Sequence, residues 1–106
     1  MSLTLSALSL GSDCTLERNF ERYQLTGQIA DNIGTTNKIT VVGRPYNPYA
    51  SVTLRIGDSG DFVANGSELT LDWTEISGVN YCTLNVRVAL SGTNQRIYQI
   101  LIKQIT

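Results

Sequence analysis

Charge is scarce in this sequence. Charged residues make up 16 % of its 106 residues and the formal net charge is −1, whereas about 25 % is usual for soluble domains. No basic stripe is present, so nucleic acid is not expected as a partner. No apolar run reaches the length of a membrane span, and the opening MSLTLSALSL lacks the basic start of a signal peptide. We therefore expect neither membrane insertion nor export by the usual route.

Histidine is absent from the sequence, and this absence bears on the one stretch that resembles a catalytic motif. Residues 57–60 spell GDSG, letters that surround the nucleophilic serine in some proteases. A serine nucleophile needs a base, normally a histidine oriented by a carboxylate. Gly and Asp also tolerate the left-handed backbone of tight turns. We expect a turn at 57–60, with Ser59 not catalytic and the protein not an enzyme.

The sequence has few metal-ligating residues. Its two cysteines, Cys14 and Cys82, stand in a chain without an export signal, and thiols inside cells stay reduced. This favours two independent buried thiols over a disulfide, which stays an open alternative. Oxygen side chains gather between positions 58 and 68 but match no calcium loop. We expect no metal and no cofactor.

Alternating apolar and polar residues dominate the chain. The polar residues are mostly Thr, Ser, Asn and Gly, which suit strands joined by turns. Runs such as SVTLRI (51–56), ELTLDW (68–73) and TLNVRVAL (83–90) repeat with period two, the mark of half-buried strands. The sequence predicts one all-β domain over residues 1–106, an antiparallel β-sandwich or small β-barrel. The predicted core residues are Leu54, Leu71, Trp73, Val86 and Val88.

Turn signals separate these runs. Asn65-Gly66 lies between FVA and ELTL, and both residues accept positive φ, so this pair predicts a hairpin. Ser77-Gly78 predicts another turn. The segment 14–26 has no clear period; its neighbours favour an extended conformation, with a short helix as the alternative.

The two ends of the chain are unusually apolar for edge strands. RIYQILIKQI (96–105) is apolar on both faces, which predicts a central strand or a strand in a subunit contact. LTLSALSL (3–10) carries no charge, although natural edge strands are usually blunted by charge or proline. Either the two runs pair with each other, or they meet a neighbouring subunit.

The loop GRPYNPYAS (43–51) carries aromatic side chains beside an arginine. Proline stiffens the loop, and its tyrosines suit a protein partner or a sugar ring. The alternative, slightly favoured, is that they fold back over the end of the core. Together with the C-terminal run, the candidate interaction residues are Arg44, Tyr46, Tyr49, Ile97, Tyr98 and Leu101.

In composition and strand pattern the chain resembles the small β-structured accessory proteins of tailed-phage particles, such as capsid cement, decoration or neck and tail adaptor proteins. The resemblance implies a structural protein in the virion, made in the host cytoplasm, which binds itself or capsid or tail subunits. It assigns no functional residue. The competing interpretation is a carbohydrate-binding β-sandwich that stacks sugars on Tyr46, Tyr49, Trp73 or Tyr81.

Overall fold

The computed structural model describes residues 3–33 and 37–105, which form strands joined by turns and loops, without a helix. The predicted all-β single domain is confirmed. The strands are β1 (Leu5–Ser9), β2 (Cys14–Leu16), β3 (Gln28–Asn32), β4 (Lys38–Thr40), β5 (Val42–Pro45), β6 (Ser51–Ile56), β7 (Val63–Ala64), β8 (Glu68–Thr70), β9 (Thr74–Ile76), β10 (Val79–Ala89) and β11 (Gln95–Gln104).

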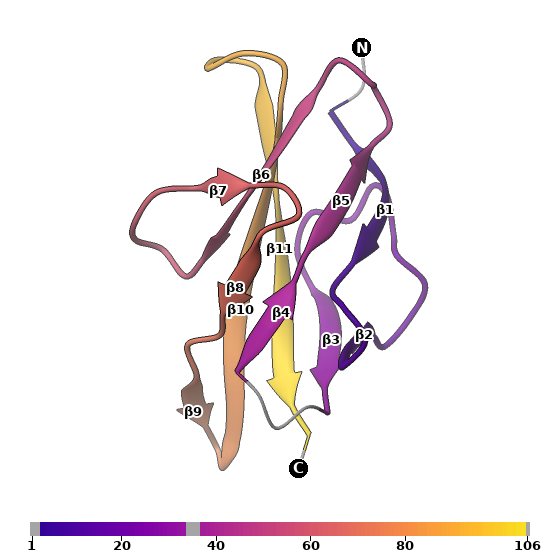
Figure 1. Cartoon of the computed structure of the whole chain (residues 1–106). Helices are drawn as coiled ribbons and strands as arrows, with labels where there is room; N and C mark the ends of the chain where they lie inside the picture. Colours follow the sequence, from indigo (N-terminus) through magenta and orange to yellow (C-terminus); the bar gives the residue numbers. More distant parts are fainter. Residues whose placement is uncertain (1–2, 34–36, 106) are drawn as a thin grey trace.

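The strands form two layers (Figure 1). The larger is one sheet in the order β2-β3-β11-β10-β6-β7, with β9 added beside β10. The smaller consists of the pairs β1-β5 and β4-β8, where β4 and β5 follow each other along one line. All pairs are antiparallel except β3 and β11, which run parallel.

The core lies between the layers and is built by the alternating runs. Leu54, Val86 and Val88 are fully buried and Leu71 nearly so, as predicted. The prediction that Trp73 is a core residue is wrong, because its side chain is only partly buried and packs against the edge of the core. Its indole Nε1 donates to Asn37 Oδ1 over 2.9 Å, and this polar contact keeps one side of the ring at the surface.

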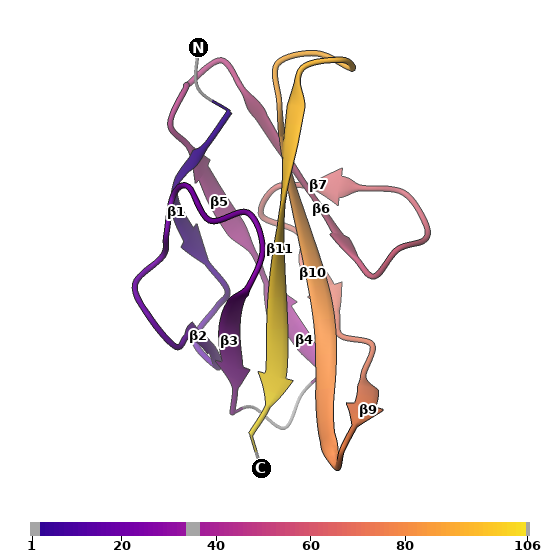
Figure 2. The same cartoon turned by 180° about the vertical axis from the view of Figure 1, so that it is seen from behind.

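The C-terminal run forms β11, which lies in the centre of the large sheet between β10 and β3 (Figure 2). This confirms the central-strand alternative. Ile100 and Ile102 face the core and are fully buried. β1 pairs with β5 and not with β11, so the alternative in which the two terminal runs pair with each other is wrong.

The GDSG stretch is a turn, as predicted. Gly57 and Gly60 have φ of 74° and 89°, backbone that favours glycine. Ser59 is exposed between them, in the loop from β6 to β7. The Ser77-Gly78 turn is confirmed as well, between β9 and β10.

The Asn65-Gly66 pair also forms a turn, but the predicted hairpin around it is wrong. β7 pairs with β6, and β8 pairs with β4 in the other layer. The Asn65 side chain accepts from Gly43 N at 2.9 Å and donates to Gly43 O at 2.8 Å. The chain therefore passes from one layer to the other at this turn. The Asn65 side chain bonds both backbone groups of Gly43 in β5, as a neighbouring strand would.

The segment 14–26 is extended and then irregular, which confirms the favoured alternative. Cys14 and Cys82 are both buried free thiols, as expected. Among the residues that the structure describes, no helix could cross a membrane.

Candidate functional site

Three tyrosine side chains stand out on the surface. Tyr23, Tyr46 and Tyr49 are 76 %, 57 % and 88 % exposed. The exposure of Tyr46 and Tyr49 overturns the favoured expectation that they fold over the core. We call Tyr23, Tyr46 and Tyr49, together with Arg22, the tyrosine surface.

Arg22 links two of these rings. Its guanidinium carbon lies 3.6 Å from the ring centroid of Tyr46 and 5.0 Å from that of Tyr23. Its Nε donates to Thr4 Oγ1 over 2.7 Å, and Tyr46 N donates to Thr4 O over 2.9 Å. The segment before β1, the β2–β3 loop and the loop after β5 therefore meet at one place, which fixes the rings before any partner binds.

The loop that carries Tyr46 and Tyr49 is held by its own hydrogen bonds. Asn47 Oδ1 accepts from Tyr49 N over 3.0 Å, and Asn47 O accepts from Ala50 N over 3.0 Å. Pro48 limits the backbone between these bonds. Tyr49 is thus presented on a stiff turn, which lowers the entropy cost of a contact.

The other candidate interaction residues divide into two groups. Arg44 is exposed on β5, two residues before Tyr46. Ile97 and Leu101 are half-buried on the outer face of the large sheet, opposite the core.

The prediction that Tyr98 is an interaction residue is wrong, because its side chain is fully buried and faces the core. Its hydroxyl donates to the carbonyl oxygen of Arg22 and accepts from Leu5 N over 3.0 Å. Its ring lies 5.6 Å from the Phe20 ring, between centroids. Tyr98 therefore supports the tyrosine surface from below and offers no surface to a partner.

Trp73 and Tyr81 do not extend this surface. Trp73 lies between β8 and β9, and Tyr81 lies near the start of β10; both segments are at the end of the molecule away from the β5–β6 loop (Figure 1). Tyr81 is half-buried on the outer face of the large sheet. The stacking platform considered from the sequence is therefore divided between two ends.

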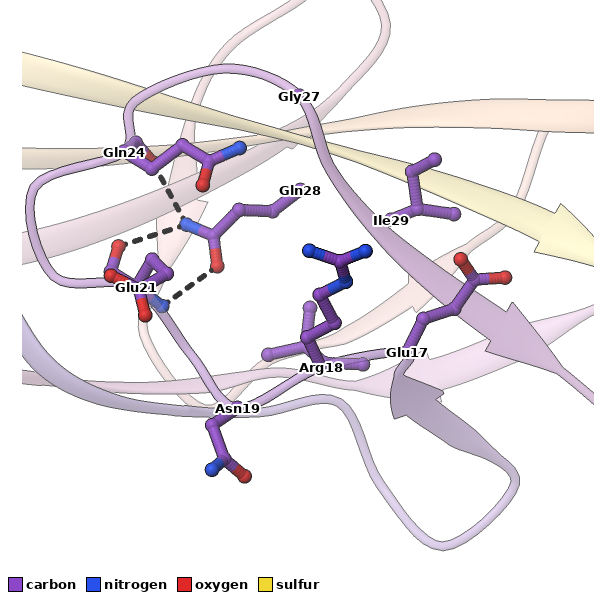
Figure 3. Close-up of a pocket in the computed structure, with 9 residues that line it drawn as sticks. Glu17, Arg18, Asn19, Glu21, Gln24, Gly27, Gln28 and Ile29 are labelled. Atoms are coloured by element: carbon purple, nitrogen blue, oxygen red, sulfur yellow. Dashed lines mark hydrogen bonds between the residues drawn. The ribbon is translucent and has the colours of Figure 1, made fainter.

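A hollow of about 250 Å³ lies beside the β2–β3 loop (Figure 3). On its wall, Gln28 Oε1 accepts from Glu21 N over 2.9 Å, and Gln28 Nε2 donates to the carbonyls of Glu21 and Gln24. The whole amide is thus used to hold the loop in shape. The rest of the wall is formed by Leu16, Glu17, Arg18, Asn19, Gly27 and Ile29, which include no serine, cysteine or threonine nucleophile.

No group of three or more Cys, Asp or Glu side chains that could hold a metal is found within residues 3–33 and 37–105. A scan against protein-family models, a search of curated proteins and a search of solved structures gave no match to this chain. The functional argument therefore depends on the chain's own surfaces.

Proposed function

We propose that this chain is a non-enzymatic structural protein that binds neighbouring protein subunits in a multi-copy assembly. The observation that carries the proposal is the tyrosine surface: three exposed rings on stiff loops, with Arg22 fixed between two of them. Tyrosine and arginine are enriched where protein interfaces gain most of their energy. Stiff loops add to this because little side-chain freedom is lost on contact.

The composition supports a particular setting, the particle of a tailed phage, where the chain would act as a cement, decoration or tail-associated protein. Such proteins stabilise a shell or tube by contacts repeated with its symmetry. The chain would then be made in the host cytoplasm and reach the virion by assembly. Low charge suits this role, since a net charge of −1 gives little repulsion between copies.

A carbohydrate-binding module is the second candidate, because exposed tyrosines also stack on sugars. The position of Arg22 argues against it. Its guanidinium lies 3.6 Å from the Tyr46 ring centroid and so covers one face of that ring. Of the two loop tyrosines, this leaves Tyr49 with both faces available for stacking.

Photo-crosslinking tests the proposal. A photoreactive phenylalanine replaces Tyr49, and the variant chain is produced in the cells that normally make it. After irradiation, covalent products are identified by mass spectrometry. We expect one defined protein product, which an excess of the unmodified chain competes away. The matched control carries the same group at Ile76, which is 56 % exposed on β9 at the other end of the molecule.

Two results would contradict the proposal. One is the same set of products from both positions, which would indicate random collision. The other is no protein product together with binding of the chain to a glycan array that Tyr49→Ala abolishes. The second result would favour the carbohydrate module.

A further inference from the structure

Two arginines on the outer face of the large sheet are held in place without an acidic partner in the described part of the chain. The guanidinium carbons of Arg55 and Arg87 lie 4.4 Å and 4.1 Å from the ring centroid of Phe62. Arg55 Nε donates to Gly57 O over 3.1 Å, and Arg87 Nε donates to Thr53 Oγ1 over 3.0 Å. Within residues 3–33 and 37–105, no carboxylate lies within 4.0 Å of either guanidinium group.

The terminal nitrogens of both groups are therefore available while their orientation is fixed. Arg55 and Arg87 are both partly buried beside Phe62, and stacking on an aromatic ring limits their rotation. Guanidinium groups prepared in this way bind carboxylates in a two-pronged geometry. We call Arg55 and Arg87, which both stack on Phe62, the arginine pair.

The same face carries two carboxyl groups, Glu17 and Asp31, at the edge of the sheet opposite the arginines. Asp31 is on β3, and Glu17 follows β2, with Glu17 N bonded to Ile29 O over 2.9 Å. A hydrogen bond with Asp31 is the main cause that raises the pKa of Glu17, and the nearby cations Lys103 and Arg18 oppose this less. Asp31 Oδ1 is buried and has no hydrogen-bond donor in the described part of the chain. We call Glu17 and Asp31 the acidic pair.

The strands β3, β11 and β10 also present three apolar side chains and one threonine on this face. Ile29, Leu101 and Thr83 stand side by side on β3, β11 and β10, and Ile97 lies further along β11. All are half-buried on the outer face. In Figure 2, β3, β11 and β10 are nearest the viewer, and the second layer, with β4 and β5, lies behind them.

We propose that this outer face binds the same face of a second copy of the chain, with the acidic pair of each copy on the arginine pair of the other. A twofold axis lying in the contact plane exchanges the two ends of the face, so each copy's arginine pair lies opposite the other copy's acidic pair. Ile29 and Leu101 of the two copies then meet at the centre, where apolar contact adds the main stabilisation. The inference rests on the proposed assembly role and names one partner in it.

Charge exchange between copies tests this contact, with sedimentation equilibrium of the purified chain as the measurement. We expect the unmodified chain to dimerise, and both Arg55→Glu/Arg87→Glu and Glu17→Arg/Asp31→Arg to weaken the dimer at least tenfold. Mixing the two variants should restore dimers, because each supplies what the other lacks. Higher salt should weaken the unmodified dimer.

The control is Arg96→Glu, an exposed charge reversal at the end of β11 that should leave the dimer constant unchanged. Circular dichroism and thermal unfolding confirm that each variant folds, and the single changes Arg87→Gln and Glu17→Gln replace any pair that does not. A monomer at all concentrations overturns the inference. So does a dimer that survives both reversals, or a mixture that fails to associate. Crosslinking at Tyr49 concerns a different surface, so the proposed function and this contact can fail separately.

Discussion

The hydroxyl of Tyr98 joins two segments that are far apart in the sequence: it donates to the carbonyl of Arg22 and accepts from the N–H of Leu5. Tyr98 is on the central strand β11, whereas Arg22 is in the β2–β3 loop and Leu5 is the first residue of β1. One buried group in the middle of the large sheet thus fixes the position of the exposed tyrosine surface. A change at Tyr98 should therefore affect both the stability of the fold and the proposed subunit contact.

The first prediction concerns this link. Tyr98→Phe keeps the ring but removes the hydroxyl that bonds the buried N–H of Leu5 and the partly buried carbonyl of Arg22, so the free energy of unfolding should fall by about 1–3 kcal/mol. Urea denaturation measures the change. Tyr81→Phe is the control, because Tyr81 is half-buried and its hydroxyl has no hydrogen bond within residues 3–33 and 37–105. The effect there should stay within about 0.5 kcal/mol. Equal effects would contradict the role assigned to the Tyr98 hydroxyl.

The second prediction concerns the turn between β9 and β10. Ser77 has φ of 53° and Gly78 has φ of 82°, a pair of left-handed residues that suits Asn-Gly. Ser77→Asn should therefore raise stability by about 0.5–1 kcal/mol. Thermal unfolding measures it, with Ser91→Asn in the β10–β11 loop as the control. A loss of stability would show that the serine side chain has a role of its own.

The third prediction concerns thiol reactivity. Burial raises the pKa of Cys14 to about 11, with smaller contributions from Asp31 and Cys82, and burial also raises the pKa of Cys82. Only the thiolate reacts, so both thiols should label slowly with iodoacetamide at pH 8 in the native state and rapidly in strong denaturant. Rapid labelling of the folded chain would contradict the buried positions of these residues.

The same shift has a consequence for stability. The folded state of Cys14 holds its proton to a higher pH than the unfolded state, whose pKa is near the ordinary value of 9.0. The contribution of the protonated Cys14 thiol to the free energy of unfolding is therefore complete below pH 9. It is lost as pH rises from 9 toward 11. Unfolding measured across this range should show the fall, and Cys14→Ala should reduce it.

The fourth prediction concerns the acidic pair. The hydrogen bond and like charge of Asp31 raise the pKa of Glu17 above its ordinary 4.5. The folded state therefore holds a proton on Glu17 to a higher pH than the unfolded state does. The contribution of this proton to the free energy of unfolding is fully present below pH 4.5 and is lost as pH rises through the raised pKa. Glu17→Gln should match the unmodified chain at low pH and be slightly more stable at pH 7. The comparison is made at concentrations where the chain is monomeric, with Glu75→Gln on β9 as the control.

Periodicity was enough to predict most of the fold. Leu54 and Val86 lie inside because alternation fixes which face of a strand is buried. Trp73 belongs to the same pattern yet lies at the edge, because its indole N–H needs a polar partner and finds it in Asn37. The Asn65-Gly66 hairpin failed for a related reason: the Asn65 side chain bonds to Gly43, a contact across 22 residues that local spacing does not contain.

The binding surfaces were harder to predict. Tyr46 and Tyr49 were recognised from a proline-stiffened loop, but the position of the Tyr46 ring depends on Arg22 and Thr4, which come from other segments. Tyr98 was assigned to a contact surface because both faces of β11 are apolar, and alternation alone does not say which face the second layer covers. The arginine pair was missed, because Phe62 follows a turn and only the fold brings its ring against Arg55 and Arg87.

The parallel pairing of β3 with β11 sets the order in which this chain can acquire its structure. β3 and β10 do not pair directly, and the large sheet is continuous only through β11, at residues 95–104. During synthesis, β2 and β3 leave the ribosome long before the strand that joins them to the rest of the sheet. Pairing over such long separations is slow, and the waiting strands have open edges. A nascent chain halted before residue 95 would therefore hold two unjoined pieces of a sheet, and would be a natural target for chaperones.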